Sequence, residues 1–432
     1  MRGFFHVLSV AEFTAVLREF PVLGAECVPL AEADGRVLAE AVHPDEDLPQ
    51  NDRSCMDGYA VRAADLFGAS ETNPAYLDSV ATLEITARPD FTLAPGQCAG
   101  VVTGGCPPPG ADAVVMVEHT EDLGAGTIEV RRAVAPGENL MLRGEDFRVG
   151  DVALSAGSPL RPQEIGLLAA LGVPRVWVAR RPRVGVLATG DELVDVDAPV
   201  RPGLVRDVNT VTLASLARRA GAAPVVLGRV PDDASLLREA VEQGLSACDV
   251  LLLSGGSSVG VRDLTLDVLK DIGGMEILAH GVAISPGKPT ILARQTTSDG
   301  VKAVWGLPGQ VTSAQVVMHV LTCPFLAWIM GDAKAFSPER RLTRRAVLTR
   351  NTPSKPGRED YVRVVLSFPA EEERGGQGPG PGGGADDSLP RATPVLGKSG
   401  LLGTLLKAQG VIRIPAEEEG FLAGRAVDVW LF

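Results

Sequence analysis

The spacing of apolar residues changes several times along the chain, and each change predicts a different kind of structure. Residues 9–20 open with a serine that is followed three positions later by a glutamate, and their apolar residues recur at helical spacing. This capping-box pattern predicts an amphipathic helix. A second helix is expected at residues 30–40, and a short one at residues 162–171, ended by Gly172.

Short alternating runs separated by turn residues fill residues 51–143, and similar runs return after residue 331. Alternation with a period of two predicts strands, so both regions are expected to be β-rich. The second region contains residues 371–387, which are rich in Gly, Pro and charged residues and cannot build a core. We expect a disordered loop there.

The middle of the chain, residues 181–331, alternates apolar strands with helices. This pattern predicts a doubly wound, three-layer α/β domain in which helices cover both faces of a parallel sheet. A length of 432 residues agrees with several domains, since domains average about 150 residues. The predicted fold class is therefore α/β plus β, with these parts: a discontinuous N-terminal domain at 1–50 and 144–180, a β-rich inserted domain at 51–143, the α/β domain at 181–331, and a C-terminal β domain at 332–432.

Composition and charge exclude several classes of protein. The formal net charge is −13 and aromatic residues make up 4% of the chain, so a general attraction to nucleic acid or to an anionic membrane is not expected. The six cysteines are scattered without a CxxC pair, which favours reduced structural thiols over a zinc site. The N-terminus does not resemble a signal peptide, and the apolar run at 316–330 is interrupted and too short to span a bilayer. A cytoplasmic location is the expectation.

Three glycine-rich loops follow strands of the middle domain, at residues 188–193, 254–260 and 306–310. Because the carboxyl ends of the strands form the ligand crevice of an open α/β sheet, all three loops are expected at one rim. The loop at 254–260 precedes a helix, where free amide groups and the helix dipole hold phosphate. It matches neither the dinucleotide nor the P-loop fingerprint, and its glycines are equally compatible with a tight turn.

Acidic residues accompany these loops: Asp191, Glu192 and Asp263, with Lys288 in a loop further along. Carboxylates repel a phosphate unless a cation lies between them, and Mg²⁺ typically combines one or two carboxylates with phosphate oxygens. A Mg²⁺ site is therefore predicted, although each residue taken singly also fits a helix-terminal or solvated position. Asp232 and Asp233 follow another strand of this domain. Because Asp233 is expected to cap a helix, Asp232 is the better ligand candidate of the two.

Several motifs, taken together and in order, resemble one family. They are SCMDGYA at 54–60, TGGCPPPGADAVV at 103–115, GED at 144–146, PRVGVLATGDELV at 182–194, SGGSSVG at 254–260 with Asp263, PGKP at 286–289 and GLPGQ at 306–310. The family that they resemble is the molybdopterin molybdenumtransferases, or molybdenum insertases, which include the E domain of gephyrin.

The resemblance implies an elongated homodimer of four-part chains. It also implies an enzyme that inserts molybdate or tungstate into adenylylated molybdopterin with Mg²⁺, releasing AMP and the molybdenum cofactor. A molybdopterin adenylyltransferase is then a candidate partner, and neither nucleic acid nor a membrane is expected. Two other interpretations stay open: an adenylyltransferase-like activity of the α/β domain, and a non-enzymatic dimeric scaffold that presents a peptide groove.

The loops and the resemblance together give the candidate residues. The acidic positions that match family residues implicated in activity are Asp146, Glu192, Asp232 and Asp263, and the expected metal ligands are Asp191, Glu192 and Asp263. The substrate-binding candidates are Asp57, Thr103, Thr189, Gly190, Gly255, Gly256, Ser257, Ser285, Pro286, Gly287, Lys288, Pro308 and Gly309, with Arg358 and Ser399 as further oxyanion-site residues.

Two positions depart from the family pattern. Family members commonly carry a basic residue where this chain has Ser285, and an Asn-Pro pair where it has Gln310 and Val311. Loss of one positive charge is expected to weaken oxyanion capture or to change the choice between molybdate and tungstate.

Overall fold

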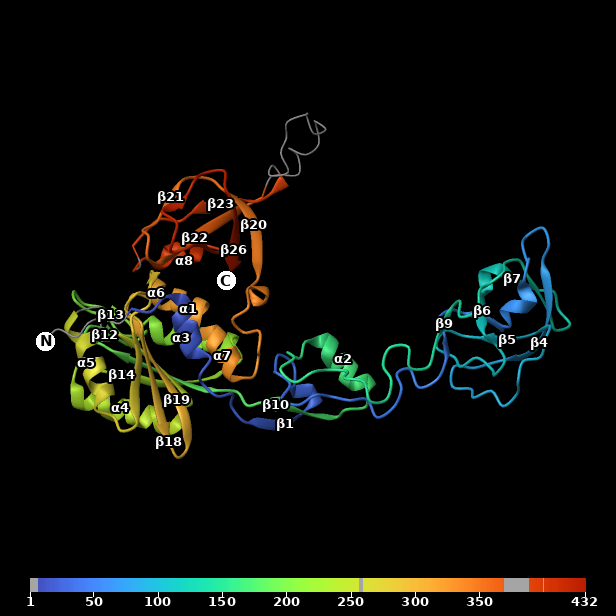
Figure 1. Ribbon diagram of the computed structural model, residues 1–432, viewed down its shortest axis with the longest axis horizontal. Coiled ribbons are helices and arrows are strands. Elements are labelled where there is room, and N and C mark those ends of the chain that lie inside the picture. The colour runs from blue at the N-terminus through green and yellow to red at the C-terminus, as the bar shows by residue number, and fades with distance from the viewer. Residues whose placement is uncertain (1–6, 256–258, 369–387, 399) are drawn as a thin grey trace. The chain divides into compact units, whose positions relative to one another are not determined.

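The computed structural model describes residues 7–255, 259–368, 388–398 and 400–432 (Figure 1). By its contacts the chain divides into two compact units. The large unit consists of Met1–Glu26, Gly35–Ala39 and Val178–Phe432, and the small unit of Cys27–Asp34 and Glu40–Trp177. The four-part boundaries stay a prediction. The loop predicted at 371–387 lies outside the described residues.

The first helix, α1 (Val10–Leu17), begins with the predicted capping box. The backbone N–H of Ser9 donates to Glu12 Oε2 at 2.8 Å, and the N–H of Glu12 donates to Ser9 Oγ at 3.2 Å. Phe13 and Leu17 are fully buried, so the apolar face of the helix packs into the core of the large unit.

The helix predicted at residues 30–40 is wrong. The structure has there only the 3₁₀ turn η1 (Leu30–Glu32). Gly35 takes a φ of 70°, which a right-handed helix does not allow, and Leu38 then forms an isolated β-bridge. The short helix predicted further along the chain is confirmed as α2 (Pro162–Ala170).

The small unit confirms the β-rich region predicted at 51–143. Its six-stranded sheet has the order β6-β3-β5-β4-β8-β7 and buries an apolar cluster that includes Leu77, Val115 and Ile128. The strands are β3 (Gly58–Val61), β4 (Ala75–Thr82), β5 (Gln97–Val101), β6 (Ala113–Met116), β7 (Thr120–Asp122) and β8 (Thr127–Val130), with the turns η2 (Ala63–Leu66) and η3 (Val117–His119). Two-stranded pairs join β2 (Arg53–Ser54) to β9 (Leu140–Met141), and β1 (Ala25–Pro29) to β10 (Arg175–Ala179).

The middle domain, in the large unit, carries a six-stranded sheet with the order β14-β11-β15-β19-β18-β16. Neighbours β14, β11, β15 and β19 are parallel, as predicted, but β18 runs antiparallel to its two neighbours, β19 and β16. Thr297 pairs with Gly300 across a tight hairpin, whereas a parallel connection needs a crossover of about a dozen residues. The strands are β11 (Arg183–Thr189), β14 (Ala223–Val230), β15 (Val250–Gly255), β16 (Met275–His280), β18 (Ile291–Thr297) and β19 (Gly300–Pro308); β12 (Leu193–Val194) and β13 (Val205–Arg206) form a separate pair.

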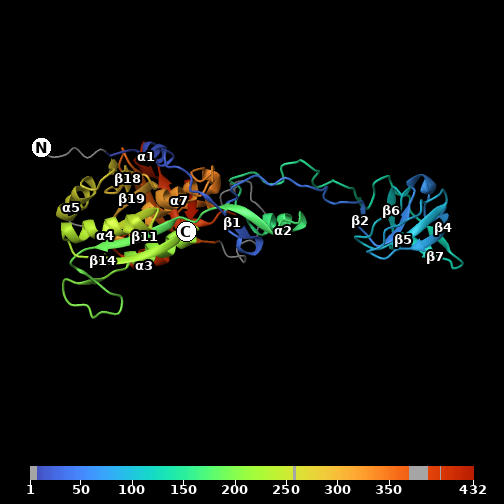
Figure 2. The same cartoon turned by 90° about the horizontal axis from the view of Figure 1, so that it is seen from below.

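Helices cover both faces of this sheet (Figures 1 and 2). One face packs against α1, α3, α6 and α7 in a core that contains Phe13, Trp305 and Phe325. The other face packs against α4 and α5 in a core that contains Leu237 and Leu251. The helices are α3 (Asn209–Arg219), α4 (Ala234–Ala247), α5 (Val259–Lys270), α6 (Val311–Val317) and α7 (Cys323–Ile329). The predicted three-layer α/β arrangement is confirmed.

One helical stretch, Val311–Ile329, has the length and composition of a membrane-spanning helix, but 67% of its most apolar window is buried inside the protein. It consists of α6, the π-helical turn η4 (Met318–Thr322) and α7. The helix is longer than the run predicted at 316–330, because it begins at Val311 and continues past Pro324, which stands in the first turn of α7, where a missing N–H is tolerated. The stretch is a core helix of the large unit.

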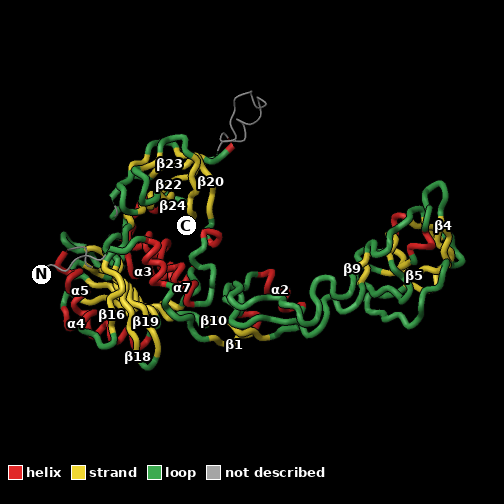
Figure 3. The backbone as a smooth tube through the Cα atoms, viewed as in Figure 1, coloured by secondary structure: helices red, strands yellow, loops and turns green. Residues whose placement is uncertain are grey.

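The C-terminal part forms a closed β-barrel. Its sheet order is β17-β22-β23-β20-β26-β24, and β24 also pairs with β22, which closes the ring (Figure 3). The strand β17 (Ile284–Ser285), from the middle domain, pairs in parallel with β22, so that Ser285 faces Asp360. The remaining elements are β20 (Thr343–Leu348), β22 (Glu359–Ser367), β23 (Arg391–Pro394), β24 (Gly410–Ile414), β26 (Ala426–Leu431), the pair β21 (Thr352–Pro353) and β25 (Gly420–Phe421), the turn η5 (Pro338–Arg340) and α8 (Leu402–Lys407).

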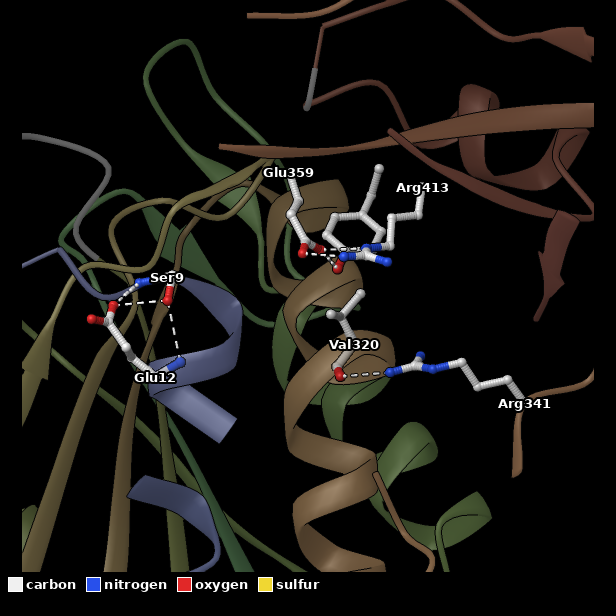
Figure 4. Close-up of polar contacts among 7 residues, drawn as sticks. Ser9, Glu12, Val320, Arg341, Glu359 and Arg413 are labelled. Carbon is white, nitrogen blue, oxygen red and sulfur yellow. Dashed lines mark hydrogen bonds and ion pairs between the residues drawn. The ribbon is translucent and has the colours of Figure 1, made fainter. Parts of the chain in front are cut away.

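A buried carboxylate stands at the start of β22, and two nearby side chains hold it. Glu359 accepts hydrogen bonds from Arg413 Nε and Nη2 at 2.8 and 2.6 Å, and from the Tyr361 hydroxyl at 2.5 Å (Figure 4). Below this group in Figure 4, Arg341 donates to the carbonyl oxygen of Val320 at 3.3 Å. The Arg341 contact connects the barrel side of the large unit to the π-helical turn of the core helix.

Candidate functional site

The carboxyl ends of three parallel strands meet at one rim of the central sheet. Thr189 at the end of β11 pairs with Gly255 at the end of β15, and Gly255 pairs in turn with Pro308 at the end of β19. The loops predicted to share a rim therefore do so. A pocket opens at this rim, and its lining includes Thr189, Gly255, Thr265, Pro289 and Pro308.

Close backbone approach makes glycine necessary at two of the predicted positions. A Cβ atom on Gly255 would lie 2.1 Å from the carbonyl oxygen of Thr189, so a side chain would force β15 and β11 apart. A Cβ on Gly287 would lie 2.7 Å from Val317 Cγ2, and this residue also has a φ of 123°. The loop that carries Lys288 is thereby seated directly against the core helix.

The rim brings two of the predicted acids together. Thr189 Oγ1 donates to Asp232 Oδ1 at 2.9 Å, and the backbone N–H of Asp232 donates to Asp191 Oδ1 at 3.1 Å. Glu192 folds back toward the rim, because a Cβ atom on Gly190 would lie 2.6 Å from Glu192 Oε2. Asp191 and Asp232 thus gather at the end of β11, and the Glu192 carboxylate packs against Gly190 in the loop that follows this strand.

The hard carboxylate oxygens of Asp191 and Asp232 suit Mg²⁺, which keeps several waters and uses only one or two protein carboxylates beside phosphate oxygens. Among the side chains that the structure describes, no group of three or more metal-ligating residues forms a ready-made cage. Asp263 lies in α5, but its side chain is not among those described, and Gly256 and Ser257 lie outside the described residues. The donor set fits a metal that is completed by a phosphorylated substrate.

Lys288 is exposed, and none of the described carboxylates forms an ion pair with its ammonium group. Its loop is fixed on both sides. Ser285 belongs to β17, and the Thr290 hydroxyl donates to the carbonyl oxygen of Gly287 at 2.7 Å. Ser285 and Pro286 are half-buried beside it. A free cation on a fixed loop is suited to an anionic ligand.

Arg358, which the sequence assigns to the oxyanion site, lies 3.0 Å from Asp360 Oδ1 through its Nε. Its Nη2 also donates a hydrogen bond of 3.4 Å to Asp360 Oδ2, so the carboxylate largely compensates the guanidinium charge. Ser399, the other predicted residue, lies outside the described residues. Arg358 is therefore a poor source of uncompensated positive charge.

Sequence reasoning missed a better placed cation, Arg363. Its side chain is 8% exposed and donates to Thr312 Oγ1 at 3.1 Å, to Thr404 Oγ1 at 2.7 Å and to the carbonyl oxygen of Gly397 at 3.1 Å. These acceptors are all neutral, and no carboxylate in the described ranges pairs with it. Burial lowers the pKa of Arg363. The signal in the sequence was an arginine in the middle of an apolar strand, which argues for a buried charge with a specific purpose.

The other predicted residues belong to the small unit. The N–H and the hydroxyl of Thr103 donate to Asp57 Oδ1 at 2.7 and 2.8 Å, and these bonds lower the pKa of the Asp57 carboxyl. Asp146 is exposed, and its N–H donates to the carbonyl oxygen of Leu48 at 3.1 Å. Asp57 and Thr103 are thus hydrogen-bonded to each other within the small unit.

Three family models match separate parts of the chain. Residues 8–172 match "MoeA N-terminal region (domain I and II)", residues 185–328 match "Probable molybdopterin binding domain", and residues 382–432 match "MoeA C-terminal region (domain IV)". The pocket at the rim lies in the second of these regions.

Relatives and solved structures agree with these matches. The chain is 37% identical to the molybdopterin molybdenumtransferase of Nostoc, over 72% of this chain and 71% of that protein. It is 31% identical to the molybdopterin molybdenumtransferase of Bacillus subtilis, over 94% of this chain and 89% of that protein. The crystal structure of a molybdopterin biosynthesis moeA protein from Pyrococcus horikoshii OT3 superposes with a TM-score of 0.80 at 29% identity, covering 99% of this chain and 100% of that one.

Proposed function

Since the chain belongs to the molybdopterin molybdenumtransferase family and is an enzyme of molybdenum cofactor biosynthesis, we propose that it inserts molybdate or tungstate into adenylylated molybdopterin with Mg²⁺ and releases AMP. The observation that carries this proposal is the contrast of charges in the large unit. Carboxylates gather at the end of β11, whereas Arg363 and Lys288 offer positive charge that no described carboxylate neutralises.

The acids would hold the metal. Asp191 and Asp232 are linked through the N–H of Asp232, so their carboxylates have fixed positions at the rim. Glu192, which packs against Gly190 in the same loop as Asp191, and Asp263 from α5 are further candidates. When bound, Mg²⁺ supplies Lewis-acid polarisation of the substrate's phosphate oxygens.

The cations would hold the oxyanion. Arg363 is pre-oriented by Thr312 and Thr404, so it loses little freedom when an anion arrives. Lys288 is exposed at the end of a loop whose base is fixed. In the overall reaction the two dithiolene sulfurs replace two oxyanion oxygens, which leave as water, and the phosphoanhydride bond to AMP is cleaved by one water.

The test is AMP release from adenylylated molybdopterin, measured by chromatography with and without molybdate and Mg²⁺. The proposal expects AMP only when both are present, together with formation of molybdenum cofactor. If the chain instead consumed ATP and molybdopterin to form the adenylylated product, an adenylyltransferase-like function would replace it. If it bound a peptide partner and released no AMP under any condition, the scaffold interpretation would replace it.

We further place this enzyme in the cytoplasm as a homodimer that receives its substrate from a molybdopterin adenylyltransferase. Support for the homodimer and for the partner comes from the family resemblance of the motifs. Light scattering on the purified chain tests the dimer, and co-purification with the adenylyltransferase tests the handover. A monomer at micromolar concentration would contradict the proposed homodimer.

A further inference from the structure

Two polar side chains at the start of α3 are almost completely enclosed. Asn209 is 8% exposed and Thr210 is 7% exposed. The amide nitrogen of Asn209 donates to Ser254 Oγ at 2.7 Å and to the carbonyl oxygen of Gly309 at 2.8 Å. Because a backbone carbonyl can only accept, the contact with Gly309 fixes the orientation of the amide. The carbonyl oxygen Oδ1 of Asn209 therefore points away from both partners.

Neither Asn209 Oδ1 nor Thr210 Oγ1 has a hydrogen-bond partner in the part of the chain that the structure describes. A buried polar atom without a partner costs free energy, and proteins leave few of them. Two such atoms on consecutive residues are a cost that stability alone does not explain. A function that supplies their missing partner does explain it.

Asn209 contacts the rim of the central sheet, where the parallel strands end. Ser254 belongs to β15 and Gly309 follows β19, so Asn209 holds together the ends of two strands whose loops border the rim pocket. Gly309 also precedes α6, whose residue Thr312 receives the hydrogen bond from Arg363. The Asn209 amide thus lies beside the strand ends that border the rim pocket, and Thr210 is its neighbour in the chain.

We infer that Asn209 Oδ1 and Thr210 Oγ1 form a specificity subsite that accepts an N–H or O–H group of the organic part of the substrate, either its pterin or its ribose and adenine. This inference rests on the proposed function. The amide oxygen can only accept, and the hydroxyl can accept or donate, so the subsite is selective for a ligand donor. Because both oxygens are screened from solvent, binding requires a small displacement of the neighbouring loops.

Thr210→Val removes the unpaired hydroxyl and keeps the shape of the side chain. The backbone N–H of Thr210, which donates to Asp207 Oδ1 at 3.0 Å, is unchanged. The matched control is Thr322→Val, since Thr322 Oγ1 is equally buried and also unpartnered among the described residues. Thr322 stands ten residues after Thr312, about 15 Å further along the core helix.

The experiment measures the dissociation constants of AMP, molybdopterin and adenylylated molybdopterin for the full chain, together with its melting temperature. We expect Thr210→Val to weaken at least one ligand by about tenfold without lowering the melting temperature of the ligand-free protein. Thr322→Val should bind all three as the wild type does. Whether the affinity for AMP or the affinity for molybdopterin falls shows which half of the substrate the subsite binds.

Wild-type affinity of Thr210→Val for all three ligands would overturn the inference, and so would an equal loss in Thr322→Val. Failure of the wild-type protein itself to bind any of the ligands would instead overturn the proposed function. Thr210→Ser, which restores a hydroxyl without the methyl group, should regain the affinity lost in Thr210→Val. If Thr210→Val does not fold, Thr210→Ala replaces it in the same comparison with Thr210→Ser.

Discussion

Arg363 donates a hydrogen bond of 3.1 Å to Thr312 Oγ1, which connects a barrel strand to the first turn of α6. The guanidinium is buried among neutral acceptors, so its charge is available to an anion. We expect Arg363→Met to weaken molybdate binding by at least about tenfold. The melting temperature should fall by only a few degrees, since a buried charge without a counterion contributes little net stability.

Arg358→Met is the matched control for that prediction, because Arg358 already has Asp360 as a counterion. Molybdate affinity, measured by calorimetry, should be nearly unchanged in this variant. A larger loss in Arg358→Met than in Arg363→Met would show that the sequence-based assignment to Arg358 is right and that the structural one is wrong.

The sequence predicted the rim from local rules. Loops that follow parallel strands had to meet there. The sequence favoured Asp232 over Asp233 as a ligand because Asp233 was expected to cap a helix, and the structure confirms that Asp233 caps α4. The contact between Asp191 and the N–H of Asp232 was not predictable, since it depends on the bend of the chain after two different strands. Arg363 was missed for the same reason, because its partners Thr312 and Thr404 are distant in sequence.

Failures of the fold prediction also have local causes. The apolar spacing at residues 30–40 satisfied a helical pattern, but it does not reveal that Gly35 takes a positive φ. The antiparallel course of β18 follows from the hairpin between Thr297 and Gly300. Apolar periodicity indicates a strand without giving its direction.

Gly255 is expected to tolerate no side chain. A Cβ atom there would lie 2.1 Å from the carbonyl oxygen of Thr189, so Gly255→Ala must separate the ends of β11 and β15. We expect AMP release to fall by at least about a hundredfold, as for misplacements of about 1 Å at a reaction centre. Gly273→Ala is the control, because no atom lies within 4 Å of a Cβ atom there, and it should keep full activity.

Arg413→Met is expected to destabilise the protein by about 2 kcal/mol, because it leaves the carboxylate of Glu359 buried with only the Tyr361 hydroxyl as a partner. The value is below that of a fully buried pair, since the Arg413 side chain is 43% exposed. Urea unfolding measures the change. The double variant Glu359→Gln with Arg413→Met should recover most of the loss, and additivity of the two single changes would contradict the pairing.

The stability of the large unit is expected to fall as the pH drops from about 6.5 to about 4. Burial, with the charges of Arg219 and Arg341, lowers the pKa of His319 to about 4. The unfolded chain therefore binds a proton in this window that the folded chain does not, and the unfolding free energy decreases by about 3 kcal/mol toward its acid end. In His319→Phe, which keeps a ring against Phe432, this part of the pH dependence should disappear, and an unchanged profile would assign it to other groups.

If the rim acids hold Mg²⁺ against the substrate, Asp232→Asn should change the Mg²⁺ dependence of AMP release. The substitution keeps the oxygen that accepts from Thr189 at 2.9 Å and removes the charge. Asp233→Asn, at the neighbouring helix cap, is the control, since asparagine also caps helices. We expect Asp232→Asn to raise the half-saturating Mg²⁺ concentration by about tenfold or more, and Asp233→Asn to leave it unchanged. An identical Mg²⁺ dependence in wild type and Asp232→Asn would contradict this role of the rim acids.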